Sequence, residues 1–379
     1  MKEVKKMNFT CNKIDLENAL SYASRASNSK AIVSIQECVL LTADKKDGIT
    51  LVGTDNQISI DTKPFFTDVE EEGSIALNAR LFMDIVKKLP GNRIHVKVDA
   101  KLNAILTSGH SVLKMAGLNA HDFPLVVEEE LVCHKKYKIK ANSLKDMVRQ
   151  TIFSVSTDPS KPILTGELME IKENELRVIA IDMFRISYRA EKFTEPAEDS
   201  KAVVPSKALG ELSRMVNAES DGDVEFFFTD KKAVFLTEDF RLVASLHHGD
   251  YIRYDQIFNE DFSTKLKVNR ELFLHSCERV MLIASDGKPI SMKLEISEND
   301  LLVSALSERG EVRDNINCET EGKEMVIYFN ARYFIDVLRV VEVEEVTLKF
   351  NSIMSPCTIS IEEAHDNFKY LIVPLRPPQ

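Results

Sequence analysis

The sequence predicts an α+β fold that consists of three tandem copies of one domain, each with two helices and several strands. The first observation is a helix-like segment that occurs three times, starting at Asn78, Pro205 and Asn330. These starts lie 127 and 125 residues apart, which is far longer than the period of a short-repeat solenoid. The 379 residues therefore divide into three domains of the commonest size.

Two further markers repeat with the same spacing. An apolar-periodic segment recurs at intervals of 128 residues, around Leu16, Leu144 and Leu272. An alternating run of apolar and polar residues also occurs in each copy, at residues 49–55, 176–182 and 301–307. Because three independent markers share one register, we predict three domains, at residues 1–129, 130–258 and 259–379.

The two helices of a copy are predicted from apolar residues at spacings of three and four. In the first copy, the apolar faces are Leu16, Ala19, Leu20 and Ala23 for one helix and Leu81, Ile85, Val86 and Leu89 for the other. Pro90 and Gly91 form a stop signal for the second helix. The six expected helices span residues 12–26, 78–89, 142–151, 205–216, 269–283 and 330–341.

Strands are predicted between and after the helices, where the period changes to two. The clearest alternation is in residues 93–98, 223–228 and 345–350. Acidic or polar stretches at residues 127–130 and 259–264 are expected to join the copies.

Composition limits the class of protein. No apolar run approaches the roughly 20 residues of a membrane span, and the N-terminal residues lack the apolar stretch of a signal peptide, so we expect a cytoplasmic protein. The cysteines stand singly, without CxxC spacing. Buried free thiols are therefore favoured over a disulfide framework or a zinc site. The six are Cys11, Cys38, Cys133, Cys277, Cys318 and Cys357.

Charge is distributed unevenly along the chain. The net charge is −11, which by itself argues against a nucleic-acid partner. The six expected helices, however, hold 13 Lys and Arg against 8 Asp and Glu, so they carry +5. Helices that shared one surface would present a mildly positive lining, suited to weak contact with phosphates irrespective of base sequence. The alternative is that these cations only solvate outer helix faces, and charge counting leaves both interpretations open.

Six short segments, in order along the chain, together resemble one family. They are Met7–Thr10, Leu77–Phe82, His121–Pro124, Arg149–Thr157, Lys161–Gly166 and Leu371–Arg376. None is a strong motif alone, but their order over three repeats of the right length is specific. The chain resembles the bacterial sliding clamps, the beta subunits of DNA polymerase III, over essentially its whole length from Met7.

The resemblance implies a ring-forming clamp fold. Two copies would close head to tail into a homodimer of six domains, with helices lining the hole and sheets outside. Double-stranded DNA would thread the hole without base readout, and the ring would tether a replicative polymerase and raise its processivity. The implied partners are DNA, a second copy, the polymerase, a clamp loader and repair proteins. Neither catalysis nor a cofactor is expected.

The resemblance also places candidate DNA-contacting cations on the helices and one in a loop. The alternative for each is a solvated surface residue. They are Lys30, Arg80, Lys87, Lys88, Lys145, Arg149, Lys207, Arg214, Arg279 and Arg332.

A second implied site is a groove in which partners dock a short linear peptide. An apolar cleft flanked by cations suits Leu or Phe anchors and an acidic group, although each apolar member alone would also fit an interdomain core. The candidates are Leu164, Ile181, Met183, Phe184, Arg185, Ile186, Ile252, Ile257, Met354, Pro356, Leu371, Val373 and Arg376.

The chain departs from the family within this groove. Where members commonly have a Gly or Ser followed by His, this chain has Met183 and Phe184. Residues 251–254 read Tyr-Ile-Arg-Tyr in place of Phe-Pro-Asp-Tyr, and Gln256 stands where some members carry Arg. These differences leave the peptide preference open.

Ring closure requires contacts between the first and third domains of opposite subunits. The resemblance places Leu113 on one side and Leu282 and Ile283 on the other, and apolar residues suit such an interface. A core position is the alternative for all three.

The two rival functions are an enzyme and a protein-binding scaffold. The chain has no P-loop, GxGxxG, HExxH or GxSxG motif, so an enzyme is disfavoured. A metal site at His247, His248 and Asp250 is also disfavoured, because neighbouring residues of a strand point to opposite faces. A three-domain scaffold that binds proteins without encircling DNA remains the alternative, and it gives no reason for positively charged helices.

Overall fold

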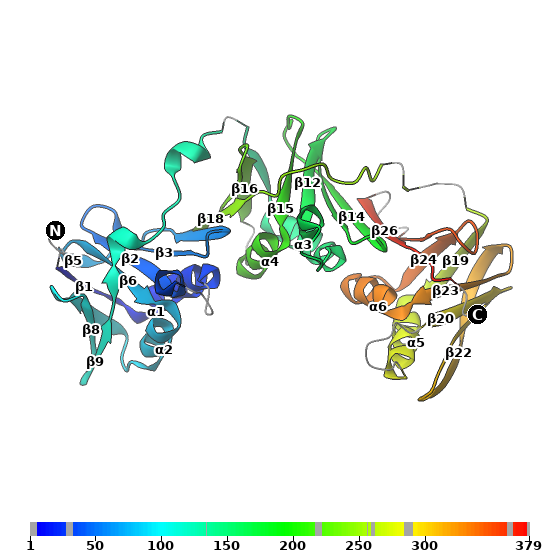
Figure 1. Ribbon diagram of the computed structural model, residues 1–379, viewed down its shortest axis with the longest axis horizontal. Coiled ribbons are helices and arrows are strands. Elements are labelled where there is room, and N and C mark those ends of the chain that lie inside the picture. Colours follow the sequence, from blue (N-terminus) through cyan, green and yellow to red (C-terminus); the bar gives the residue numbers. More distant parts are fainter. Residues whose placement is uncertain are drawn as a thin grey trace. The chain divides into compact units, whose positions relative to one another are not determined.

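A computed structural model describes residues 6–27, 33–133, 135–216, 222–255, 257–258, 262–283, 291–361 and 367–376. The chain forms two compact units, each described by itself. The first unit comprises Met1–Asn142 and Arg214–Leu246, and the second comprises Ser143–Ser213 and His247–Gln379. Figure 1 shows the helices and strands of both units.

The order of elements repeats three times, as the sequence predicts. Each repeat has one strand, a helix, four or five strands, a second helix and then three or four strands. The first repeat is β1 (Met7–Asn12), α1 (Lys13–Ala23), β2 (Cys38–Asp44), β3 (Gly48–Thr54), β4 (Ile58–Thr62), β5 (Asp68–Glu71), β6 (Gly73–Asn78), α2 (Ala79–Lys88), β7 (Arg93–Val98), β8 (Asn103–Ser108), β9 (Ser111–Ala116) and β10 (Leu118–Asn119).

The second and third repeats have the same pattern. The second is β11 (Tyr137–Lys140), α3 (Ala141–Arg149), β12 (Gly166–Lys172), β13 (Glu175–Ile181), β14 (Arg185–Lys192), β15 (Ser200–Pro205), α4 (Ser206–Met215), β16 (Asp223–Phe228), β17 (Lys232–Leu236) and β18 (Phe240–Ser245). The third is β19 (Thr264–Asn269), α5 (Arg270–Leu282), β20 (Ser291–Ser297), β21 (Asp300–Ser307), β22 (Gly310–Gly322), β23 (Met325–Asn330), α6 (Ala331–Val340), β24 (Glu345–Phe350), β25 (Cys357–Ser360) and β26 (Phe368–Ile372).

Each repeat divides its strands between two sets. The strand before the first helix pairs with the strands after the second helix, as in β1-β7-β8-β9, β11-β16-β17-β18 and β19-β24-β25-β26. The strands between the helices form the other set, as in β6-β2-β3-β4, β15-β12-β13-β14 and β23-β20-β21-β22. All of these pairings are antiparallel.

Neighbouring repeats are joined by main-chain pairing. In the first unit, β4 pairs with β18, with Ile60 opposite Leu242. In the second unit, the equivalent strand β14 pairs with β26, with Ile186 opposite Leu371. The sets of strands therefore merge into continuous sheets of nine and twelve strands.

Strand β22 belongs to both sets of the third repeat. Its first part, residues 310–317, pairs with β21, and its last part, residues 318–322, pairs with β19. In the first repeat the same two roles are divided between β4 and β5, with Pro64 between them. Proline cannot donate a ladder hydrogen bond, so it interrupts the strand there.

The helices pack against the strands and contribute apolar side chains to the buried cores. α1 buries Leu16, Ala19, Leu20 and Ala23, as the periodicity predicts. For α2 the expected face was wrong at one position, because Leu81 is half exposed and Phe82 is fully buried in its place. The helix begins at Ala79, so the spacing Phe82, Ile85, Val86 points to the core.

Helices α1 and α2 pack together, as do α5 and α6 (Figure 1). A cation at the start of the first helix reaches the end of the second. Lys13 Nζ donates to the carbonyls of Lys87 and Leu89 at 3.0 and 2.8 Å. Arg270 makes the equivalent bonds to the carbonyls of Leu338 and Val343, at 3.0 and 2.9 Å. These contacts satisfy the orphan carbonyls at the C-terminal ends of α2 and α6.

The prediction of free thiols is confirmed, but only four of the six cysteines are buried, because Cys133 and Cys318 are half-buried. All six are free thiols, and burial raises the pKa of several of them, Cys38 to about 11 and Cys11 to about 12. Within the described ranges no group of three metal-ligating side chains occurs. Among the same residues no helix is long and apolar enough to cross a membrane.

One carboxyl group is buried in the second repeat. Glu167 of β12 has no exposed surface, and Thr151 Oγ1 donates to its Oε2 at 2.7 Å. Its Oε1 has no hydrogen-bond partner among the described residues. Burial raises the pKa of Glu167 to about 8, because the charged form would lose its hydration.

We expect Glu167 to make stability depend on pH. In the folded state it keeps its proton up to about pH 8, whereas in the unfolded chain it loses the proton near pH 4.3. Stability therefore falls as pH rises through this window, by up to about 1.4 kcal/mol per pH unit. Glu167→Gln should lose less stability than the wild type as pH rises from about 5 to about 8, measured by thermal unfolding. Exposed Glu129→Gln is the control, and parallel curves for all three proteins would contradict the expectation.

Candidate functional site

The predicted cations lie mostly on exposed faces of the helices. Arg80, Lys87 and Lys88 on α2 and Arg332 on α6 are exposed, and no described carboxylate lies within ion-pair distance of them. On the second helix pair, Lys207 and Arg214 are exposed and Lys145 is half-buried. Lys30 lies outside the described residues.

Helix starts are fixed by asparagine caps. The side-chain oxygens of Asn78, Asn269 and Asn330 accept backbone N–H bonds from the first turns of α2, α5 and α6, at 3.0, 3.0 and 3.1 Å. Such a cap is worth about 1 kcal/mol. The cap sets where each helix begins and therefore which side chains of α2 and α6 face outward.

Two of the predicted cations are held by carboxylates within the second unit. Arg149, at the end of α3, pairs with Asp146 and Glu342 at 3.1 and 3.0 Å, and it donates to the carbonyl of Val340 at 3.3 Å. Arg279 of α5 pairs with Asp314 at 2.8 Å. Arg149 thus joins the second repeat to the end of α6.

The predicted groove residues centre on one face of the sheet formed by β12, β13, β14 and β26. Ile181 lies opposite Ile186, and Ile186 opposite Leu371, so these three side chains form one row. They belong to a buried apolar cluster that we call the apolar face. Its members are Leu168, Ile179, Ile181, Ile186, Val203, Tyr254 and Leu371.

A segment after β18 covers part of the apolar face. Ile252, Ile257 and Val373, all predicted for the groove, are half-buried against it. Tyr251 also packs there, and its hydroxyl donates to the carbonyl of Ile179 at 3.2 Å. Leu164 is buried at the end of a short 3₁₀ turn that leads into β12. Gln256 lies outside the described residues.

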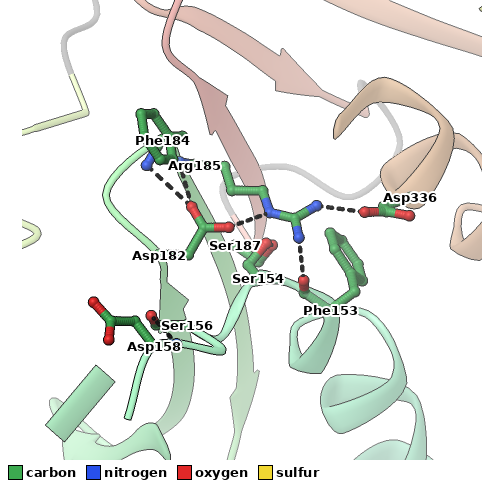
Figure 2. Close-up of polar contacts among 9 residues, drawn as sticks. All are labelled: Phe153, Ser154, Ser156, Asp158, Asp182, Phe184, Arg185, Ser187 and Asp336. Carbon is green, nitrogen blue, oxygen red and sulfur yellow. Dashed lines mark hydrogen bonds and ion pairs between the residues drawn. The ribbon is translucent and has the colours of Figure 1, made fainter. Parts of the chain in front are cut away.

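Arg185 lies on the opposite side of the sheet from the apolar face. Successive side chains of a strand alternate in direction, so Arg185 points away from the face that Ile186 occupies. Its guanidinium binds Asp182 and Asp336 at 2.8 and 2.5 Å and donates to the carbonyl of Phe153 (Figure 2). It also lies 4.7 Å from the ring centre of Tyr333. The Arg185 side chain is only 11% exposed, and its charge is neutralised by two carboxylates of the same chain.

Phe153, Tyr333 and Asp336 complete this cluster and were missed from sequence. Asp336 has an equivalent in Asp84 of α2, which is exposed, so its position in the repeat does not distinguish it. The Tyr333 ring stacks on Phe184 at 6.3 Å. Together these contacts tie the loop between β13 and β14 to α6.

All three repeats match domains of one known protein family. Residues 7–127 match the N-terminal domain of the DNA polymerase III beta subunit, 138–252 its central domain and 255–376 its C-terminal domain. The chain belongs to the DNA polymerase III beta subunit family. Its members are sliding clamps, so this chain is a processivity clamp, and the scaffold alternative is not favoured.

Relatives of this clamp span its full length. The beta sliding clamp of Staphylococcus epidermidis is 30% identical over 98% of this chain and 99% of that protein. The structure of the sliding clamp from Bacillus subtilis superposes with a TM-score of 0.92, at 30% identity over 98% of this chain and 100% of that one. The Thermotoga maritima DNA polymerase III beta subunit gives 0.90 at 25% identity, over 98% and 100%.

We expect Arg185 to be structurally essential in this clamp. Arg185→Met would leave Asp182 and Asp336 without their cation and should destabilise the second unit by about 2–4 kcal/mol. Asp336→Asn removes one partner only and should cost about 1 kcal/mol. Calorimetric unfolding of both single variants and the double variant measures the coupling. Arg332→Met is the control, because Arg332 lies on α6, the helix that carries Asp336. A loss of unfolding free energy for Arg185→Met no larger than that for Arg332→Met would contradict the expectation.

Proposed function

We propose that two copies of this clamp close head to tail into a ring that encircles double-stranded DNA and tethers proteins bearing short peptide motifs. The observation that carries the proposal is the repeated strand pairing between repeats. β4 pairs with β18, and β14 pairs with β26. β4 and β14 have an equivalent in the third repeat, which is the first part of β22. β18 and β26 have an equivalent in the first repeat, which is β9.

Both of these strands have an open edge within the described parts of the chain. β9 ends the five-stranded sheet β5-β1-β7-β8-β9. Residues 310–317 of β22 pair with β21 on one side only. An open edge is a template for another strand, and pairing β22 of one copy with β9 of another would repeat the existing junction. Made twice, this contact closes a ring of six repeats.

Side chains near the two edges support the same contact. Leu113 of β9 is 39% exposed, and Leu282 at the end of α5 is 77% exposed. Ile283 is half-buried and lies within 3.9 Å of the Cβ position of Gly310, at the start of β22. An exposed Lys114 on β9 and Glu311 on β22 supply opposite charges. Burial of these apolar side chains would anchor the interface.

The helices supply the DNA-facing surface in this proposal. Exposed cations on α2 and α6 would meet phosphates, whereas Arg149 and Arg279 are paired with carboxylates and would mainly shape the lining. Contacts to phosphate carry no base information, so the ring can slide. Acidic residues elsewhere would keep DNA from other surfaces.

The apolar face is the proposed docking site for partner peptides. Polymerase, clamp loader and repair proteins would insert apolar anchors against Ile181, Ile186 and Leu371. In this proposal Arg185 fixes the loop before β14 from the opposite side of the sheet, and Arg376, which is exposed, offers a cation to the peptide. The proposal includes a cytoplasmic location and assigns the chain neither a catalytic step nor a cofactor.

We expect Lys87→Glu/Lys88→Glu to weaken DNA binding. Reversing two exposed cations per subunit removes favourable phosphate contacts and should lower affinity for a duplex by about tenfold or more, with a shallower salt dependence. Fluorescence anisotropy with labelled duplex DNA measures both. Lys45→Glu/Lys46→Glu is a matched control, an adjacent lysine pair in the turn between β2 and β3. Equal loss in both variants would mean that net charge alone matters.

We expect Leu282→Asp to open the ring. A buried aspartate without a partner would destabilise each interface by several kcal/mol. Sedimentation should show a dimer for the wild type and a monomer for the variant, and electron micrographs should show closed rings of six segments only for the wild type. Val132→Asp changes a similarly exposed side chain in the linker after the first repeat and should remain dimeric. A monomeric wild type would overturn the ring.

A further inference from the structure

In the first two repeats, the segment after the last strand covers one more strand and the sheet face beside it. β10 pairs with β6, the strand before α2, and Phe123 then joins a buried apolar cluster with Ala76 of β6. His247 pairs with Val203 of β15, the strand before α4, and Tyr254 then joins a buried cluster with Val203. The chain itself therefore closes these two strands and the faces beside them that point away from the helices.

The chain after the third repeat begins in the same way. The Leu375 N–H donates to the carbonyl of Tyr328 at 2.7 Å. Tyr328 lies on β23, the strand before α6, two residues before its end, as Ala76 does on β6 and Val203 on β15. Main-chain groups that point outward alternate along an edge strand, so those of Val326 also point away from β20. They have no main-chain partner among the described residues, and the edge of β23 is open there.

The sheet face beside β23 differs from the two covered faces. In the second repeat, the row of side chains across β15, β12 and β13 is apolar and consists of Val203, Leu168 and Ile179. The equivalent row of the third repeat is polar and consists of Tyr328, Lys293 and Ser304. Near the open edge, the apolar residues of this face lie in the next row, in which Val326 and Leu302 flank Glu295. That row is polar throughout in the other two repeats.

A hollow of about 760 Å³ lies at this second row. Leu302 and Val326 contribute apolar surface to it, and Val326 is 42% exposed. All of its lining residues fall within residues 295–326, so among the described residues no segment equivalent to those at Phe123 and Tyr254 enters the hollow. The hollow and the open edge of β23 are adjacent, because Val326 belongs to both.

Carboxylates outnumber cations around the hollow. Its ionisable lining residues are Glu295, Asp300, Glu324 and Arg313. Glu295 is paired with Lys293 at 2.9 Å. No described cation lies within ion-pair distance of Asp300 or Glu324. The hollow therefore repels phosphate groups and favours a basic ligand.

We propose that the hollow and the open edge of β23 together bind an extended basic segment of a partner protein. The main chain of this segment pairs with β23 at Val326, as β10 pairs with β6. One of its apolar side chains enters the hollow between Leu302 and Val326. Residues two positions before and after that side chain lie on the same face of an extended segment, so lysine or arginine there reaches Asp300 and Glu324. The site lies on β20–β23 and requires neither peptide docking at the apolar face nor ring closure.

Two fluorescent heptapeptides of equal composition test this assignment. Ser-Lys-Ser-Leu-Ser-Lys-Ser presents leucine and both lysines on one face of an extended chain, whereas Ser-Lys-Leu-Ser-Ser-Lys-Ser presents leucine on the other face. Fluorescence polarisation with the full-length protein gives the affinity of each peptide. We expect the first peptide to bind about three- to tenfold more tightly, because only this peptide buries leucine while both lysines reach carboxylates. Equal affinities would overturn the proposal.

Variants of the hollow locate the binding site. Asp300→Lys/Glu324→Lys should weaken binding of the first peptide by about tenfold or more. Glu129→Lys/Glu130→Lys makes the same change in net charge on an exposed segment after the first repeat and should keep nearly full affinity. Leu302→Ser should bring the affinities of the two peptides close together. An equal loss in both charge-reversed proteins would mean that net charge alone attracts the peptide, and it would overturn the proposal.

Hydrogen exchange of the full-length protein gives an independent measurement. The Val326 amide should exchange rapidly in the protein alone and slowly when the first peptide is present. Slow exchange in the protein alone would show that the chain already covers this edge. Protection of Ile186 and Leu371 in place of Val326 would put the peptide on the apolar face. Either result would overturn this site without affecting the proposed ring or the proposed docking of peptides.

Discussion

The structure depends on main-chain pairing across the boundaries between repeats. β4 with β18 and β14 with β26 turn separate domains into continuous sheets, so an edge strand of one repeat is protected by the next. This constraint fixes the position of everything else within each unit. The apolar face exists because β14 and β26 bring Ile186 and Leu371 into one row, although they lie in different repeats. The same series leaves the edges of β9 and of residues 310–317 of β22 without a neighbouring strand among the described residues.

Ionic contacts then secure the side of the sheet that faces the helices. Arg149 and Arg185 both extend from the second repeat to α6, one to its C-terminal end and one to Asp336. Arg185 and its two carboxylates are largely sheltered, so their pairing is worth more than an exposed pair, whereas the carboxylates that bind Arg149 are mostly exposed and contribute less. The exposed cations Arg80, Lys87, Lys88 and Arg332 behave differently, because they have no carboxylate beside them among the described residues. The helices thus use some cations for assembly and present others outward.

Much of the fold could be predicted from sequence because the same pattern of apolar and polar residues occurs in all three repeats. Helix positions, the strands at residues 93–98, 223–228 and 345–350, and the face of α1 all follow from periodicity. The error at Leu81 arose because the cap at Asn78 fixes the helix phase, and periodicity alone does not locate the cap. Arg185 was assigned to the groove by the resemblance to the family. Its actual partners, Phe153 and Asp336, lie 32 and 151 residues away, and no local pattern identifies such contacts.

The third repeat differs mechanically from the first because of β22. In the first repeat, β4 and β5 are separate strands, and the two sets of strands are joined there by residues 63–67, which include Pro64 and belong to neither strand. In the third repeat one uninterrupted strand of 13 residues pairs with both sets. Tension applied at one set of strands is therefore carried to the other by the backbone and its hydrogen bonds. We therefore expect the connection between the two sets of strands to be stiffer in the third repeat than in the first.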